Sequence, residues 1–117
     1  MSVLVVGSVA YDTVKTSAGS RADELGGSAT YFSVAGGLLS PISIVAVVGD
    51  DFHSEDVEFL ESRRVDTSGL VQKTGKTFRW TGAYSEKDVN VRETLDTQLN
   101  VFAGFSPELS IRHRNMP

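Results

Sequence analysis

The chain has 117 residues, enough for one folded domain with a core and too few for two. Its 15 acidic and 11 basic residues give a net charge of −4 without a basic run, so nucleic acid is a poor candidate partner. It has no cysteine, which excludes disulfides and thiolate chemistry, and two distant histidines, which argues against a zinc site. No apolar run could span a bilayer and Met1-Ser2 carries no charged region typical of a signal peptide, so we expect a cytoplasmic protein without a membrane partner.

The first expected element is a strand from Val3 to Val6, an unbroken aliphatic run that is typical of a central strand in a parallel sheet. The following loop reaches Asp12, which places a carboxylate just beyond the carboxyl end of the strand. Open α/β sheets bind ligands at that edge. Asp12 is therefore a candidate acceptor of hydrogen bonds from sugar hydroxyls, and the alternative is a solvated turn aspartate.

A small hairpin is expected next, because residues 13–16 favour a strand and residues 18–23 are rich in turn formers. The pair Gly26 and Gly27 then precedes an apolar run, which predicts a tight turn entering a helix with Ser28 as its N-cap. Glycine lacks a Cβ and a helix N-terminus has unpaired amides, so a polyol or phosphate could approach the main chain here. An ordinary turn before a helix is the alternative.

The helix is expected to stop at Ser40 and Pro41, and Gly36 and Gly37 favour close packing or an early end. Most of its apolar stripe should face the core. The stripe consists of Ala29, Phe32, Ala35 and Leu39.

A second buried strand over residues 42–48 completes a βαβ unit with two parallel strands. A second helix is expected over residues 54–64, with Leu60 facing inward. Asp50 and Asp51 are expected to start the turn before this helix and to cap it, rather than to act in catalysis.

Alternation replaces the helical pattern after an expected loop at residues 66–69. Even spacing puts Phe78, Trp80 and Tyr84 on one side of a strand and Arg79 on the other. A polar turn at residues 85–88 and a return strand over residues 90–95 make this a β-hairpin. Its aromatic face is expected to be buried in a core or interface, with stacking on a ligand as the alternative. One more strand is expected at residues 101–103, before a polar tail over residues 106–117.

Several of these motifs, in this order, resemble the N-terminal portion of ribokinase-like (PfkB-type) carbohydrate kinases. They are residues 7–12, the glycine pair with its helix, the strand end VVGDD and the loop VDTSGL. The resemblance covers residues 3–109 and implies an α/β fold, a parallel sheet with flanking helices plus a small β lid, incomplete at the C-terminus. Residues 1–117 would be the N-terminal part of a kinase domain, with lid segments at about 13–25 and 77–96.

The resemblance also implies an ATP-dependent phosphotransferase that acts on a sugar or nucleoside. In that family, the residues corresponding to Asp12, Gly26 and Gly27 hold substrate hydroxyls. Tyr31 stands where the family signature has an asparagine, and its phenol can stack or hydrogen-bond. With Arg79 on the expected lid strand, these are the candidate substrate-binding residues.

No catalytic residue is assigned, because the later Gly-x-Gly-Asp segment of these kinases is absent from the sequence. In the family, its aspartate takes the proton of the substrate hydroxyl. Residues 75–77 end like a P-loop, but a strand follows where a helix is needed. ATP and Mg²⁺ belong to the complete family enzyme; neither is expected to bind fully to this chain, and we expect a truncated or excised kinase.

Three hypotheses follow for the function. The first is the sugar- or nucleoside-binding portion of a carbohydrate kinase. The second is an interaction module without catalysis, which forms a homodimer through the lid hairpin. The third is a nucleotide-binding α/β domain of unrelated chemistry, which has only the βαβ pattern in its support.

Overall fold

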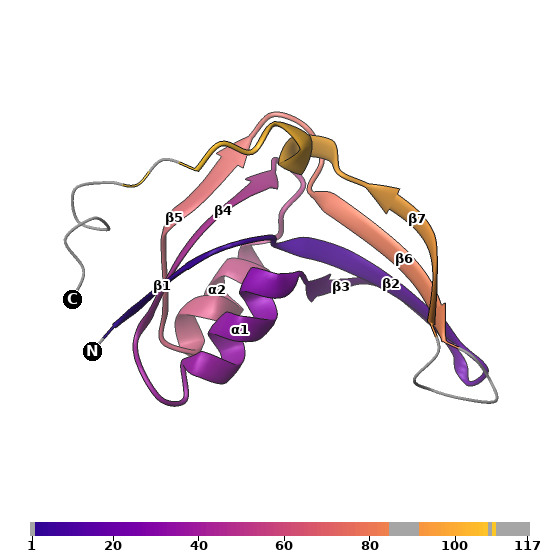
Figure 1. Ribbon diagram of the computed structural model, residues 1–117, viewed down its shortest axis with the longest axis horizontal. Helices are drawn as coiled ribbons and strands as arrows, with labels where there is room; N and C mark the ends of the chain where they lie inside the picture. Colours follow the sequence, from indigo (N-terminus) through magenta and orange to yellow (C-terminus); the bar gives the residue numbers. More distant parts are fainter. Residues whose placement is uncertain (1, 85–91, 108, 110–117) are drawn as a thin grey trace.

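The fold consists of two small sheets that form an arch, with two helices on its inner side (Figure 1). The computed structural model describes residues 2–84, 92–107 and 109. The strands are β1 (Val3–Val6), β2 (Ala10–Thr16), β3 (Gly19–Gly26), β4 (Ile42–Gly49), β5 (Val65–Lys73), β6 (Phe78–Tyr84) and β7 (Arg92–Gln98), and the helices are α1 (Ser28–Gly36), α2 (Ser54–Ser62) and the 3-10 helix η1 (Asn100–Gly104). One sheet is parallel with the order β1-β4-β5, and the other has the order β3-β2-β6-β7.

The core lies between the parallel sheet and the two helices. β1 and β4 are parallel neighbours with α1 between them in sequence, which confirms the expected βαβ unit. Ile44 of β4 belongs to the same buried cluster as Leu60 of α2. Val45 and Val47 face the other side, where residues 105–107 lie beside them. Because β4 is buried along its whole length, its sequence is uniformly apolar instead of alternating.

β1 is an edge strand, not the central strand that its sequence predicts. Among the described strands it pairs with β4 alone, and Val6 is 48% exposed. The central position belongs to β4. An aliphatic run shows that a strand can be buried on both faces, but its neighbours decide whether it is.

Helix α1 differs from its prediction at its end and on its buried face. It ends at Gly36, which confirms the early end that the glycines favoured. The expected core stripe is mostly exposed, since Phe32 is 53% and Leu39 is 89% accessible. Small side chains face the sheet instead and allow the helix backbone to approach it closely. The buried residues of α1 are Ala29, Thr30 and Ser33.

Three further differences concern the second half of the chain. Helix α2 ends at Ser62 with Leu60 buried, close to the expected bounds. The expected loop at residues 66–69 is wrong, because β5 already begins at Val65 and pairs with β4 through this stretch. The expected strand at residues 101–103 is instead part of η1. The expected turn at residues 85–88 lies outside the described residues, as does most of the expected tail.

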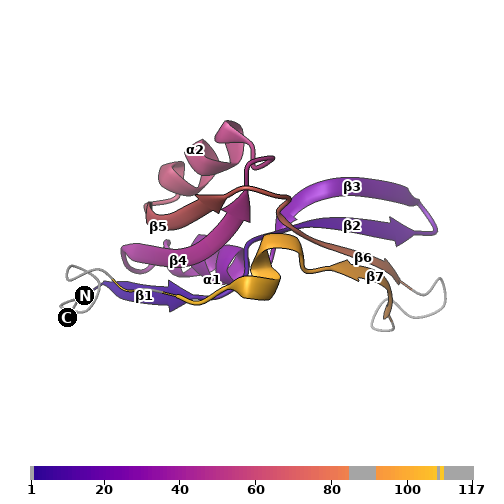
Figure 2. The same cartoon turned by 90° about the horizontal axis from the view of Figure 1, so that it is seen from above.

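The second sheet joins two hairpins that are far apart in sequence (Figure 2). β2 pairs antiparallel with β3 and parallel with β6, and β6 pairs antiparallel with β7. Both expected hairpins are therefore confirmed, and the two expected lid segments lie in one sheet. No helix in the part of the chain that the structure describes is long and apolar enough to cross a membrane.

Candidate functional site

A cavity of about 470 Å³ opens where the start of α1 faces the four-stranded sheet. We call it the Asp12 cavity. It brings together three of the predicted site residues, Asp12, Gly27 and Tyr31, with Gly26 directly behind Asp12. Its lining consists of Ser8, Ala10, Asp12, Val14, Gly27, Ser28, Tyr31, Phe78, Trp80, Tyr84 and Arg92.

The carboxylate of Asp12 lies against the backbone of Gly26, its neighbour across the β2–β3 pair. A Cβ at Gly26 would collide with the Asp12 carboxylate and lie 2.7 Å from its Cγ. The side chain of Tyr31 hydrogen-bonds to the same carboxylate. Asp12 is thus positioned by a glycine behind it and a phenol beside it, while the cavity remains open to a ligand.

Burial raises the pKa of Asp12, although the hydrogen bond from Tyr31 and the charge of Arg92 act in the opposite direction. Burial also raises the pKa of Tyr31, and the neighbouring Asp12 carboxylate adds to that effect. The phenol therefore stays protonated and available as a donor. A partly desolvated carboxylate is a strong acceptor for hydroxyl groups of a ligand.

The turn into α1 is held by Ser8 rather than by a side-chain cap. Gly27, not Ser28, is the N-cap, with φ of 95°, which corrects the prediction. The amide of Ser28 donates to the Ser8 hydroxyl (3.0 Å) and the amide of Ala29 donates to the Ser8 carbonyl (2.9 Å). The amides of Ser28 and Ala29 therefore already have acceptors within the chain. The expectation that the first amides of this helix are unpaired and free to bind a ligand is wrong for these two.

The predicted aromatic face forms one wall of the cavity. Phe78, Trp80 and Tyr84 all line it, as their even spacing predicts. The indole of Trp80 lies across Gly82, where a Cβ would collide with the ring. Its Nε1 donates to Thr94 Oγ1 (3.2 Å) on β7, which fixes the ring against the sheet.

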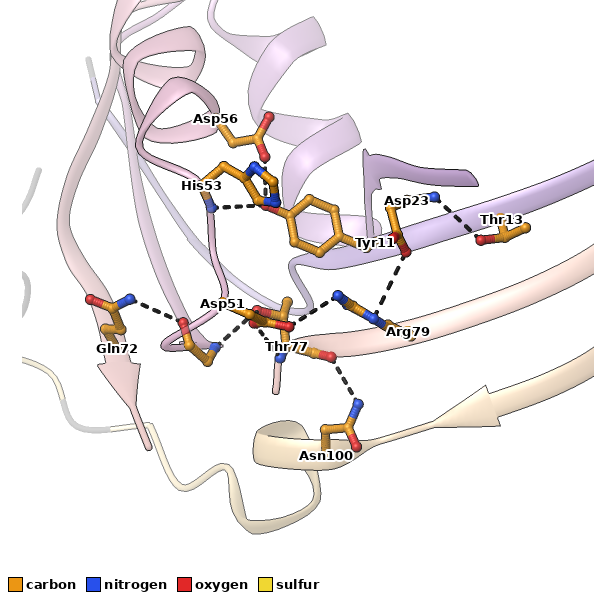
Figure 3. A network of polar contacts seen from close by, with 11 residues as sticks. Tyr11, Thr13, Asp23, Asp51, His53, Asp56, Gln72, Thr77, Arg79 and Asn100 are labelled. Carbon is orange, nitrogen blue, oxygen red and sulfur yellow. Dashed lines mark hydrogen bonds and ion pairs between the residues drawn. The ribbon is translucent and has the colours of Figure 1, made fainter. Parts of the chain in front are cut away.

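Arg79 is not brought to this cavity. Its guanidinium lies over the Tyr11 ring, 5.2 Å from the centroid, on the other face of the sheet (Figure 3). There Nη2 contacts Asp51 Oδ2 at 3.0 Å, and Nε lies 3.8 Å from Asp23. Since Tyr11 and Asp12 are adjacent in β2, their side chains point to opposite faces, and Arg79 belongs to the face of Tyr11.

Around Arg79, a polar network joins the two sheets (Figure 3). Asp51 Oδ1 accepts hydrogen bonds from the Thr77 amide (2.9 Å) and hydroxyl (2.7 Å). The Thr77 hydroxyl in turn accepts from the Gly49 amide (3.0 Å). The expected helix-capping role of Asp51 is therefore wrong, because its carboxylate anchors the first residues of β6 to the end of β4 and the N-cap of α2 is His53.

Tyr11 extends the network to α2. Its hydroxyl donates to Asp56 Oδ2 and accepts from the His53 amide (3.0 Å). Burial, reinforced by Asp56, raises the pKa of Tyr11, which therefore stays neutral at physiological pH. The network is structural in character because its members are bonded to one another.

Sequence reasoning missed Arg92 as a residue of the cavity. It is paired with Tyr84 in the β6–β7 register, and its guanidinium lies 5.5 Å from the Trp80 ring centroid. Alternation on the return strand could have placed it on the aromatic face, but the register depends on an irregularity between Thr81 and Gly82. Among the described residues, no group of three or more His, Asp or Glu side chains could hold a metal ion.

Neither a protein-family model nor a curated protein sequence matches the chain. Solved structures do. A nucleoside kinase from Burkholderia thailandensis, solved in complex with inosine, is 16% identical with a TM-score of 0.72, over 86% of this chain and 36% of that one. A ribokinase from Cryptococcus neoformans, in complex with ADP, is 20% identical with a TM-score of 0.71, over 84% of this chain and 33% of that one.

An archaeal nucleoside kinase of the ribokinase family, from Methanocaldococcus jannaschii, is 17% identical with a TM-score of 0.67, over 85% of this chain and 37% of that one. The chain thus spans about a third of the length of the structures it resembles. At these identities the likeness shows the fold. The chain has a ribokinase-like fold and fits an N-terminal fragment of it.

Proposed function

We propose that this chain is the substrate-binding portion of an ATP-dependent kinase that phosphorylates a hydroxyl of a sugar or nucleoside. One observation carries the proposal: the half-buried Asp12 carboxylate, held by Gly26 and Tyr31, faces a cavity with an aromatic wall. A carboxylate accepts hydrogen bonds from adjacent hydroxyls, and aromatic rings stack on sugar or base faces. The ribokinase-like fold supports this reading.

Phosphoryl transfer depends mostly on positioning and charge stabilisation. In the proposed enzyme, Asp12 orients the substrate hydroxyls, Tyr31 holds Asp12, and the aromatic wall supports the ring. ATP and Mg²⁺ supply the phosphoryl group and its charge stabilisation in the complete enzyme. The chain alone is expected to bind substrate without turnover.

Replacing Asp12 by asparagine is expected to weaken sugar or nucleoside binding by about tenfold or more, because the charge-assisted acceptor is lost. Isothermal titration calorimetry with ribose, glucose, inosine and adenosine measures the effect. Asp50→Asn is the matched control, since Asp50 is an exposed carboxylate outside the cavity. Equal affinities of Asp12→Asn and the parent chain would remove Asp12 from the site.

The same substitution is expected to raise the free energy of unfolding at pH 7. The pKa of Asp12 is raised from 3.8 in the folded chain, so its charged form is disfavoured there, and its contribution to stability declines as the pH rises above 3.8. Asparagine is uncharged and removes the free-energy cost of burying the charged carboxylate. The free energies of unfolding of the parent chain and Asp12→Asn should therefore converge below pH 3.8. Urea titration at pH 7 and pH 3 therefore separates lost binding from lost folding.

A second candidate is a non-catalytic module that dimerises through the lid sheet. Strand β7 favours it, because the strand lies at the edge of its sheet, all seven of its residues are exposed, and Leu95 is among them. The expected result is a mass that rises from 12.6 kDa towards twice that value with concentration in size-exclusion chromatography with light scattering. A monomer at every concentration would exclude this candidate.

A further inference from the structure

Arg92 occupies an unusual place in the Asp12 cavity. It lies at the start of β7, and its guanidinium lies over the Trp80 ring, 5.5 Å from the centroid. The Trp80 ring lies against Gly82 of its own strand, and its Nε1 donates to Thr94 Oγ1 on β7. The ring is therefore a rigid platform, and a stacked guanidinium keeps its N–H donors at its edge available for an acceptor.

The charge of Arg92 is not compensated by an ion pair within the described residues. The ion pairs found there join Arg21 to Glu24, His53 to Glu55, and Arg79 to Asp23 and Asp51. The one carboxylate that shares the cavity with Arg92 is Asp12, which is already bonded to Tyr31. Arg92 attracts the Asp12 carboxylate from a distance and opposes the rise in its pKa that burial causes, but among the described residues the two form no ion pair, so the guanidinium on the cavity wall can take an anionic group of a ligand.

We propose that the ligand of the Asp12 cavity is a polyol that carries an anionic group, a carboxylate or a phosphate, with its hydroxyls at Asp12 and its anionic end at Arg92. This inference rests on the proposed function and specifies its substrate class. The planar donor fork of arginine matches both carboxylate and phosphate oxygens. The negative charge of Asp12 repels the anionic end, so the two charged residues fix one orientation of the ligand.

The stacking of Arg92 also discriminates against a neutral nucleoside. Its guanidinium already lies over the Trp80 ring, so a base that stacks on this ring competes with the cation. Displacement would lose the cation–π contact without giving the arginine a new partner. An anionic polyol keeps the stack and adds hydrogen bonds at the guanidinium edge, so both effects favour it.

The test is calorimetry on the full chain with two matched pairs, glucose against gluconate and ribose against ribose 5-phosphate. At least one anionic member is expected to bind about tenfold more tightly than its neutral partner, and the pair that shows this identifies the anion as a carboxylate or a phosphate. In Arg92→Gln the ratio of the two affinities should fall to about one. Arg21→Gln, which removes an exposed cation outside the cavity, should keep the ratio.

Equal affinities within both pairs for the parent chain would overturn the inference, as would a preference that survives in Arg92→Gln. The proposed function fails separately. If both members of each pair bind with equal affinity and Asp12→Asn abolishes their binding, that function stands while the anionic substrate is rejected. If no member of either pair binds, the anionic ligand is rejected. Calorimetry with inosine and adenosine then tests whether the chain binds a nucleoside, as the proposed function allows.

Discussion

Replacement of Gly27 by alanine is expected to lower the free energy of unfolding by roughly 3 kcal/mol, since backbone strain and overpacking each cost about 1–3 kcal/mol. Gly27 has φ of 95°, a conformation that L residues rarely adopt. A Cβ there would lie 2.5 Å from the Ser8 carbonyl oxygen and 3.0 Å from the Ala10 amide nitrogen. Both are main-chain atoms, so the strand and the helix would have to separate to make room.

Gly19→Ala is the control that separates the two causes. Gly19 also has a positive φ, 140°, but a Cβ there would meet no atom within 4 Å. Its substitution is expected to cost only the strain, about 1 kcal/mol. Urea unfolding followed by circular dichroism measures both variants. A loss in Gly27→Ala no larger than in Gly19→Ala would show that the contact with Ser8 is not tight.

Strands β1 and β4 of the parallel sheet could be predicted because their sequences carry local signals, whereas β5 begins within an expected loop. A run such as Ile42 to Val48 has no polar residue to expose, and the glycine pair before α1 marks a turn. What could not be predicted is which faces are covered. Phe32 and Leu39 have the spacing of a core stripe, but α1 meets the sheet through Ala29, Thr30 and Ser33. The spacing of apolar residues identifies a possible buried face of a helix, but the packing of the neighbouring elements decides which face is buried.

The site shows the same division between local and tertiary information. Asp12 was a candidate because a carboxylate soon after an aliphatic strand is expected at the ligand-binding edge of an α/β sheet, but it lies within β2 and not in the predicted loop after β1. Alternation correctly grouped Phe78, Trp80 and Tyr84, and the same rule placed Arg79 on the opposite face, where the structure has it. Arg92 was missed because the pairing of β6 with β7 includes an irregularity that no local pattern fixes.

The role of Asp51 was also beyond local reasoning. A carboxylate shortly before a helix is typical of an N-cap, so local sequence favours that role for Asp51. Its actual partners, Thr77 and Arg79, lie 26 and 28 residues further along the chain. Only the meeting of the two sheets brings them together.

Asp51→Ala is expected to lower the free energy of unfolding by about 2–4 kcal/mol at pH 7, because it leaves buried donors without an acceptor. Thr77 is fully buried, and its amide and hydroxyl both donate to Asp51. Of its two ion pairs among the described residues, Arg79 would keep the longer one, the 3.8 Å contact with Asp23. Urea unfolding measures the loss, with Asp50→Ala as the adjacent, exposed control. A loss below about 0.5 kcal/mol, the range of ordinary surface substitutions, would refute the anchoring role.

The pH dependence gives an independent test of the same contact. Burial alone would raise the pKa of Asp51, but the hydrogen bonds from Thr77 and the charge of Arg79 outweigh it and hold the pKa below its ordinary 3.8. The unfolded chain then binds a proton first as the pH falls, so the stabilisation by Asp51 is complete above 3.8 and disappears as the pH falls towards the lower, folded-state pKa. Asp51→Asn lacks this titration. The parent chain should therefore lose stability relative to Asp51→Asn on acidification, and parallel curves would show that the carboxylate holds no charge-dependent contact at the junction of the two sheets.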